Sequence, residues 1–414
     1  MIKKPSPIWI IFFTILIDML GVGILIPVIP LLLTDPAYAY HLPLGVSQGY
    51  IILGFLTAIF PFMQFIATPI LGQLSDRIGR KKVLAFSLGG TALSYVIFAI
   101  GIIFKNIPLL FISRAVDGIS GGNIAVAQAA IADSSAPQDR AKNFGLIGAA
   151  FGIGFIIGPF LGGVLSNPNL ISWFNATTPF WFVAILSTLN MLSVIFFFDE
   201  TIKEKMKGKF HALQSLINIK AAVLSQKFRA FFGTAFLYTA GFNFFTTFFG
   251  VFLIKKFNYD QGGIGLYFAF VGILIALTQG LIVGFVAKRM DGLRTISIAL
   301  FVFAITLLIV SQTNVQWLLY IITIPQCIAI GLIMANLTAV ISNNALDNEQ
   351  GKVLGINASV QALAQSIPPI ISGYIAASIG AYAPVLVAAT IVFLAGISFV
   401  TFVAPRFRKI TTSH

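Results

Sequence analysis

Long apolar stretches recur along this sequence, and each is long enough to cross a lipid bilayer. A helix rises about 1.5 Å per residue, so about 20 apolar residues match a bilayer core of about 30 Å. The sequence predicts twelve such spans, at residues 7–33, 47–73, 82–104, 108–132, 142–166, 177–198, 230–254, 262–287, 294–311, 315–341, 351–378 and 380–404. We therefore expect an all-α polytopic membrane protein with twelve transmembrane helices.

The composition excludes a soluble fold. The chain is 58% hydrophobic and 9% charged, whereas soluble domains carry about 25% charged residues. The apolar runs are continuous rather than alternating, which argues against a membrane β-barrel. The first apolar stretch is too long for a signal peptide and contains Asp18, so we predict that it is an uncleaved first span.

The basic residues indicate how the spans are oriented. Of the 26 Lys and Arg residues, 22 fall in loops on the side that holds both termini, and three, Lys105, Lys255 and Lys256, fall in the opposite loops. By the positive-inside rule, both termini are cytoplasmic. The net charge of +13 is explained by these loops, so we expect the lipid bilayer, and no nucleic acid, as a partner.

An internal repeat divides the chain. Residues 139–163 resemble residues 349–373 at an offset of 210, with Asp139, Lys142, Gly145, Pro159 and Gly163 aligned to Glu349, Lys352, Gly355, Pro369 and Gly373. Such a repeat predicts two pseudo-symmetric six-helix bundles with a binding site between them. The expected organisation is an N-terminal bundle at 1–198, a cytoplasmic linker with an amphipathic helix at 199–229, and a C-terminal bundle at 230–414.

A charged turn, "GQLSDRIGRKK" at 72–82, separates the second and third spans. Its pattern is Gly72, Asp76, Arg77, Gly79 and Arg80. We expect Gly72 to allow close helix packing, Gly79 to allow a tight turn, and Asp76 to accept hydrogen bonds from a helix N-terminus. Arg77, Arg80 and Lys81 can pair with Asp76 or with lipid phosphates. Membrane topology explains the lysines that follow, but it does not explain this pattern.

The turn resembles the signature loop of the major facilitator superfamily. In that family the loop helps to hold the two halves together in the outward-facing state, so the resemblance implies a gating role for Asp76 and Arg80. The corresponding loop of the second half, "GFVAKRMDGLR" at 284–294, keeps basic residues but not the pattern. The gating charges are therefore expected to be asymmetric.

Three further stretches resemble the drug:proton antiporter subfamily. "LIDMLGVGILIPVIP" at 16–30 resembles its first-span signature, and Arg114, Gly118 and Gly122 match its fourth-span pattern. The fifth-span antiporter motif is matched by "GAAFGIGFIIGPFLGG" at 148–163. The motif residues are Gly154, Gly158, Pro159 and Gly162. Together these stretches most resemble bacterial tetracycline/proton exporters, which implies export in exchange for protons.

Three charged residues lie deep inside spans: Asp18, Arg114 and Asp117. Each costs at least about 2.5 kcal/mol in lipid, so we expect them to face protein or a water-filled cavity. A structural ion pair is one interpretation, and proton coupling is the other. A carboxylate can bind a proton when desolvated and release it when wetted or paired. Asp18 is the first candidate for that group and Asp117 the second, and the resemblance supports Asp18 and Arg114.

The second half carries polar neutral residues in place of buried charges, and the seventh span is rich in aromatics. The candidate substrate-cavity residues are Asn243, Phe244, Thr247, Gln279, Gln326, Asn336, Gln361 and Gln365. Tetracycline exporters carry further acids in the third and ninth spans, whereas residues 83–104 and 296–310 hold none. This departure argues against a tetracycline–metal chelate as the substrate and favours another bulky amphipathic molecule.

The sequence therefore predicts a secondary transporter that exports an amphipathic small molecule, a drug-like compound or metabolite, in exchange for protons by alternating access. A substrate-specific siderophore or metabolite exporter and a proton-coupled nutrient importer stay open. A scaffold that has lost transport has no need of membrane-buried charges. The sequence has no nucleotide-binding motif, which argues against an ATP-driven pump. We expect no enzyme activity or cofactor, and no metal, because Cys327 and the three histidines form no cluster. A monomer in the bacterial inner membrane is expected by resemblance.

Overall fold

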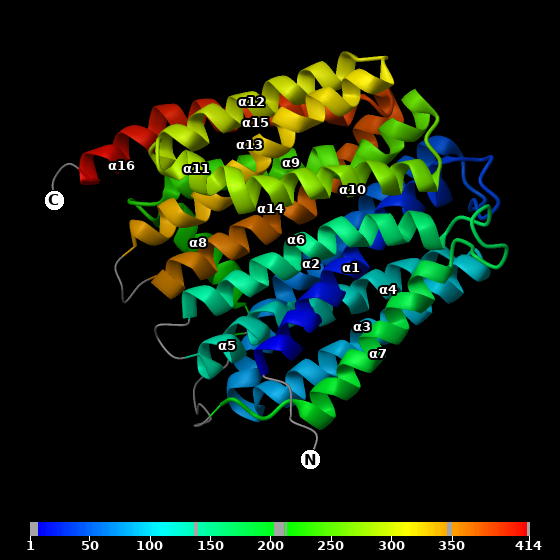
Figure 1. The fold of residues 1–414 in the computed structure, drawn as a ribbon, viewed down its shortest axis with the longest axis horizontal. Coiled ribbons are helices and arrows are strands. Elements are labelled where there is room, and N and C mark those ends of the chain that lie inside the picture. The colour runs from blue at the N-terminus through cyan, green and yellow to red at the C-terminus, as the bar shows by residue number, and fades with distance from the viewer. Residues whose placement is uncertain (1–6, 136–139, 203–210, 212, 346–349, 412–414) are drawn as a thin grey trace. The chain divides into compact units, whose positions relative to one another are not determined.

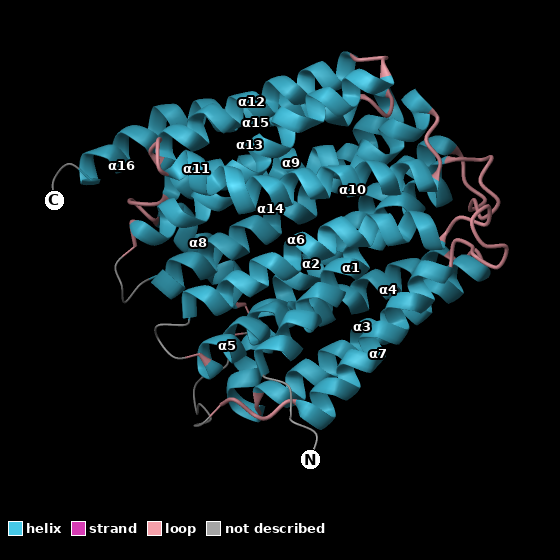
Figure 2. Cartoon of the chain, viewed as in Figure 1, coloured by secondary structure: helices cyan, strands magenta, loops and turns pink. Residues whose placement is uncertain are grey.

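The chain folds into helices of membrane-crossing length. The computed structural model describes residues 7–135, 140–202, 211, 213–345 and 350–411, and these form helices without a strand (Figure 2). Within this described part, twelve helices are long and apolar enough to cross a membrane. Each coincides with one of the predicted spans, so the prediction of a twelve-span, all-α membrane protein is confirmed. Asp139, Glu349 and residues 203–210 of the predicted linker lie outside the described residues.

The helices follow one another along the chain with short connections (Figure 1). The first six spans are built from α1 (Pro7–Thr34), α2 (Val46–Ile78), α3 (Arg80–Ile103), α4 (Ile107–Ser120), η1 (Gly121–Asn123), α5 (Ile124–Ser134), α6 (Arg140–Leu165) and α7 (Thr178–Phe197). After the linker helix α8 (Gln214–Leu224), the last six are built from α9 (Arg229–Phe257), α10 (Gln261–Leu277), η3 (Thr278–Ile282), α11 (Val283–Ala287), α12 (Gly292–Gln312), α13 (Gln316–Asn343), α14 (Gln350–Ile379), α15 (Ala383–Ser398), η4 (Phe399–Val403) and α16 (Ala404–Thr411).

The chain forms two compact units whose borders cut through two helices. Unit 1 comprises Met1–Leu44, Ile59–Gln214 and Tyr259–Gly272. Unit 2 comprises Gly45–Ala58, Ser215–Asn258 and Ile273–His414. Each unit therefore includes the first part of one helix, α2 or α10, from the other half of the sequence. The division at residues 198 and 230 stays a prediction.

The two units use the same helix pairings, as the internal repeat predicts. In unit 1, α1 packs against α6 and α7, and α3 packs against α4 and α7. In unit 2, the helices six spans later repeat this: α9 packs against α14 and α15, and α12 packs against α13 and α15. The most apolar window of α1 is 83% buried and that of α9 78% buried. The first and seventh spans therefore form the centre of their units.

A close helix contact in unit 1 depends on glycine. The start of α10 crosses α6, and a methyl group added at Gly265 would lie 2.9 Å from the carbonyl oxygen of Pro159 and 3.1 Å from the Cα of Gly163. A real Cβ does not come this close to backbone atoms, so a side chain at Gly265 would force the helices apart.

The aligned residues of the repeat make the same contact in unit 2. There the start of α2 crosses α14, and a methyl group at Gly54 would collide with the carbonyl oxygen of Pro369 and lie 3.2 Å from the Cα of Gly373. Each unit therefore contains a glycine-mediated crossing between the start of one helix and the Pro-Gly segment of another. The repeat predicted from the sequence thus corresponds to repeated packing.

The linker helix α8 presents an uncovered apolar face. Leu216, Ile217 and Val223 are exposed by 55%, 47% and 68%, whereas Ser215 and Ala222 are buried. The side chain of Asn218 holds α8 to α14 through a 3.0 Å hydrogen bond to Ser359 Oγ. The amphipathic linker helix on the membrane surface stays a prediction, which this exposed apolar face supports.

Candidate functional site

A buried acidic residue lies in the central helix of unit 1. Asp18 is 7% exposed, and neither oxygen of its carboxylate has a hydrogen-bond partner among the residues that the structure describes. Burying a polar group without a compensating hydrogen bond is costly, and more so for a charge. Asp18 therefore offers an unmet acceptor inside the helix bundle, which is the property a proton-binding group requires.

The other two membrane charges form an ion pair in α4. The guanidinium group of Arg114 donates to Asp117 Oδ2, one helix turn away, and the two residues are 5% and 3% exposed. The hydroxyl of Tyr95 donates to the same oxygen at 3.4 Å. The guanidinium also lies 4.5 Å from the centre of the Phe60 ring, a cation–π contact. All four side chains belong to unit 1.

Asn123 joins this group, although nothing in the sequence patterns selected it. It is fully buried in the 3₁₀ segment η1, and neither atom of its amide has a hydrogen-bond partner among the described residues. Asn123 is near enough to interact with the Asp18 carboxylate, on which the charge of Asp117 also acts. The preceding pair of glycines, Gly121 and Gly122, is the one sequence signal for a break in the fourth span.

The glycines of the fifth-span motif bring α6 against α1 beside Asp18. A methyl group at Gly158 would lie 2.8 Å from the Cα of Gly23, and one at Gly162 would lie 2.7 Å from the carbonyl oxygen of Ile24. One turn earlier, Gly154 faces the side chain of Met19. Small residues spaced by four thus let two backbones touch. The motif positions the helix that carries Asp18.

Gly118 and Gly122 of the fourth-span pattern act in the same way toward α2. A methyl group at Gly118 would lie 2.8 Å from the Cβ of Met63, and one at Gly122 would lie 2.9 Å from the backbone nitrogen of Thr68. The helix that carries the ion pair therefore packs closely against the second span.

The turn between α2 and α3 is built around Arg80. Gly79 has a φ of 110°, which a side chain rarely adopts, so the expected tight turn at Gly79 is present. Arg80 pairs with Asp76 at 2.7 Å and with Asp133 of α5 at 3.1 Å, and it also donates to Ser75 Oγ. Arg77 lies half-buried in the last turn of α2.

Two expectations for this turn are wrong. The residue that accepts from the N-terminus of α3 is Glu200, not Asp76: its carboxylate accepts from the backbone N–H of Arg80 at 2.9 Å and of Lys81 at 3.3 Å. Asp76 instead lies four residues before Arg80 on the preceding helix. Among the described residues, a methyl group at Gly72 would meet only Ala125 Cβ, at 3.8 Å, so Gly72 makes no close contact with a described helix. Asp133 and Glu200 are distant in sequence, and no pattern linked them to the turn.

The predicted cavity residues all lie in unit 2, in different surroundings. Phe244, Thr247 and Gln326 are buried, and Gln326 Oε1 has no hydrogen-bond partner among the described residues. Asn243 and Asn336 are half-buried and each donates to the carbonyl oxygen four residues earlier. Gln361 and Gln365 are half-buried, and Gln279 is exposed within the π-helical segment η3. Their role as substrate contacts stays a prediction.

Membrane-crossing helices with ionisable side chains buried among them define a polytopic membrane transporter. Comparison with protein families agrees, because residues 11–295 and, in an overlapping second match, residues 231–413 match the model of the Major Facilitator Superfamily. The chain belongs to the Major Facilitator Superfamily, and it is a multi-pass membrane transporter rather than an enzyme. The resemblance inferred from the charged turn is thereby confirmed.

Curated relatives cover most of the chain. It is 30% identical over 375 residues to the tetracycline resistance protein, class H, of Pasteurella multocida, covering 89% of this chain and 88% of the relative. It is 31% identical over 373 residues to the class C protein of Escherichia coli, covering 89% of each. It is 28% identical over 378 residues to multidrug resistance protein 2 of Bacillus subtilis (strain 168), covering 90% and 89%.

Solved structures share the fold. The human organic anion transporter MFSD10 (TETRAN) has a TM-score of 0.70 at 23% identity, over 96% of this chain and all (100%) of that chain. A bacterial homologue of the human lysosomal transporter Spinster, in an inward-facing and occupied conformation, has a TM-score of 0.75 at 13% identity, over 96% and 97% of the two chains. At these identities the likeness establishes the fold alone.

Proposed function

We propose that the protein exports amphipathic, drug-like molecules in exchange for protons, with both termini in the cytoplasm of a bacterial cell and the monomer as the working unit. The observation that carries the proposal is the buried Asp18 carboxylate, whose two oxygens have no hydrogen-bond partner among the described residues. The names of the relatives, tetracycline and multidrug resistance proteins, support drug efflux as the activity.

Asp18 is the proton-binding group in this proposal, and the Arg114–Asp117 pair tunes it. Asp18 and Asp117 interact electrostatically, so a change in how strongly Arg114 holds Asp117 alters the field at Asp18. Alternating access supplies such a change. Water that reaches these side chains screens their charges, and the exclusion of water strengthens the interactions between the charges. Arg114 itself stays protonated throughout.

The residues proposed to contact the substrate are the polar and aromatic side chains of unit 2 described above. Gln326 supports this role best, since its buried side-chain oxygen is unbonded among the described residues and is therefore available to a ligand. A tetracycline–metal chelate is not the favoured substrate. The resemblance to tetracycline exporters implies an acid in the third and the ninth spans, and residues 83–104 and 296–310 contain none.

The proposal is tested by accumulation of labelled compounds in cells that express the wild type, Asp18→Asn or Asp35→Asn at equal levels. The panel comprises tetracycline, a lipophilic cation and a ferric siderophore. We expect at least one compound to accumulate less in cells that express the wild type than in empty cells. Its accumulation should return to the level of empty cells when a protonophore is added. Expression of Asp18→Asn should leave its accumulation at the level of empty cells. Asp35→Asn, which removes a loop carboxylate, should export normally.

Two results would contradict the assignment. Export by Asp18→Asn that still responds to the protonophore moves the proton site to Asp117, which Asp117→Asn then tests. Accumulation that rises above the level of empty cells establishes import and overturns the export proposal.

A further inference from the structure

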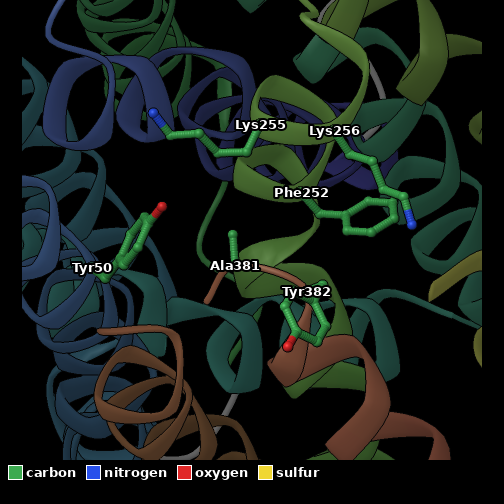
Figure 3. A pocket seen from close by; sticks show the side chains of 6 residues that line it. All are labelled: Tyr50, Phe252, Lys255, Lys256, Ala381 and Tyr382. Carbon is green, nitrogen blue, oxygen red and sulfur yellow. The ribbon is translucent and has the colours of Figure 1, made fainter. Parts of the chain in front are cut away.

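A cavity of about 390 Å³ lies in unit 2, away from the coupling site. It is found where α2 begins, where α9 ends and where the chain turns from α14 into α15 (Figure 3). Its walls are Tyr50, Phe252, Lys255, Lys256, Ala381 and Tyr382. None of these residues belongs to the group formed by Asp18, Arg114, Asp117 and Asn123, and none is a predicted substrate contact.

The two lysines of the cavity are not equivalent. Lys256 donates to the backbone carbonyl oxygen of Ser311 at 2.7 Å, and its ammonium lies 5.2 Å from the centre of the Phe252 ring. Lys255 is exposed, and its ammonium has no partner among the described residues. Figure 3 shows Lys255 reaching toward the side of Tyr50, while Lys256 extends away beside Phe252. Lys255 is therefore the cation that is free to bind a ligand.

Neither topology nor helix stability explains Lys255. In the proposed orientation this end of the helices faces outward, where the positive-inside bias disfavours lysine. Only three lysines occupy the outer loops and helix ends, and two of them line this cavity. A cation in the last turn of α9 interacts favourably with the helix dipole, but Lys256 already supplies such a cation.

Other groups of the cavity also favour an anion. Tyr50 is only 7% exposed, and its hydroxyl makes no hydrogen bond to another described residue, while its ring packs against Phe248. Tyr382 precedes the first turn of α15, a helix N-terminus whose partial positive charge attracts anions. One ammonium, two hydroxyl groups and a helix N-terminus are thus found among the groups that line a single cavity.

We propose that this cavity binds the phosphate group of an organic phosphate. Lys255 supplies the counter-charge, and the hydroxyls of Tyr50 and Tyr382 donate to the phosphate oxygens. The cavity falls within the range of small-molecule sites, about 300–1,000 Å³, and the ring of Phe252 provides an apolar wall for the organic portion. A phospholipid headgroup and a soluble phosphate ester share this chemistry. The proposal does not depend on the direction or coupling of transport.

Paired ligands that differ only in phosphate distinguish the two sources. The purified, detergent-solubilised protein is titrated with phosphatidylglycerol or diacylglycerol and analysed by native mass spectrometry, and with glycerol 3-phosphate or glycerol by calorimetry. The variants are Lys255→Gln, Tyr50→Phe and, as a matched control, Lys105→Gln, which removes the third outer lysine far along the chain from this cavity. Size-exclusion profiles confirm that each variant is folded.

In at least one of the two pairs, we expect the ligand with a phosphate to bind and the ligand without a phosphate not to bind. Lys255→Gln should weaken binding by about tenfold and Tyr50→Phe by about threefold, since one charged and one neutral donor are lost. Lys105→Gln should bind as the wild type does. Binding of phosphatidylglycerol alone identifies the lipid as the source, and binding of glycerol 3-phosphate identifies a soluble ester. The proposal is overturned if neither phosphate-bearing ligand binds, or if Lys255→Gln and Lys105→Gln weaken ligand binding equally.

Discussion

Removal of one partner of the Arg114–Asp117 pair should destabilise the fold whether or not the pair couples protons, and two variants separate the structural role from the coupling role. Arg114→Ala leaves the Asp117 carboxylate buried with the Tyr95 hydroxyl as its hydrogen-bond donor. We expect it to lower the free energy of unfolding by about 3–5 kcal/mol. The double variant Arg114→Met with Asp117→Leu removes both charges and should recover most of that loss. Thermal unfolding in detergent measures both.

Transport by the same variants then decides the role of the pair. If the pair tunes Asp18, the double variant folds but no longer exchanges substrate for protons in everted vesicles. Wild-type exchange by the folded double variant would reduce the pair to a structural element.

The sequence reveals charged site residues far better than neutral ones. Asp18, Arg114 and Asp117 stand out because charges are rare in apolar spans. Asn123, Tyr95 and Phe60 do not, since polar neutral and aromatic side chains are common in such helices. Whether they face the charges depends on helix rotation and on the 3₁₀ break at η1, which packing decides.

The N-terminus of α3 depends on a side chain from far along the chain. The Glu200 carboxylate accepts the first two backbone N–H groups of this helix. Glu200→Ala leaves these groups to water and removes a negative charge from the positive end of the helix, so we expect a loss of about 1 kcal/mol. Glu200→Gln keeps an acceptor and should lose less. Equal melting temperatures for wild type and Glu200→Ala would contradict this role.

The glycine crossing in unit 2 gives a prediction with an internal control on the same helix. Gly373→Leu should separate the start of α2 from α14, because a Cβ there would lie 2.8 Å from the carbonyl oxygen of Tyr50. Gly355 lies on the same helix, and a methyl group there would have no described atom within 4 Å. We expect Gly373→Leu to lower the melting temperature of the purified protein, and Gly355→Leu to leave it close to that of the wild type.

The spans themselves were predictable because about 20 consecutive apolar residues leave few alternatives in a membrane. The π-helical segments η3 and η4 were not, because a change from i,i+4 to i,i+5 bonding carries no compositional signature and follows from tertiary packing. The sequence likewise could not show that Gly72 lacks a close contact with the described helices, since a glycine leaves room for a contact and does not show that one is made.

The orientation of the whole chain can be tested with single cysteines. The natural cysteine, Cys327, is 1% exposed within α13, and Cys327→Ser provides a background free of thiols. With both termini cytoplasmic, a membrane-impermeant maleimide should label Ala37→Cys in intact cells and Leu213→Cys only after the cells are opened. The reverse pattern would invert the proposed topology, and with it the outward placement of Lys255.

The border between the compact units could not be read from the sequence. Hydropathy and the internal repeat both divide the chain near the linker, whereas contacts place the first part of α2 in unit 2 and the first part of α10 in unit 1. Contacts of this kind depend on which helix ends meet in a given conformation. A repeat records which segments correspond, not which ones touch.

This exchange of helix segments makes the two halves of the polypeptide interdependent. Severing the chain within the linker would yield an N-terminal fragment that carries Gly45–Ala58, a piece of unit 2, and a C-terminal fragment that carries Tyr259–Gly272, a piece of unit 1. Neither fragment contains a whole unit, so each produced alone would leave a glycine-lined helix face vacant. The protein is therefore suited to split complementation: two fragments that fail separately should accumulate together when a cell makes both.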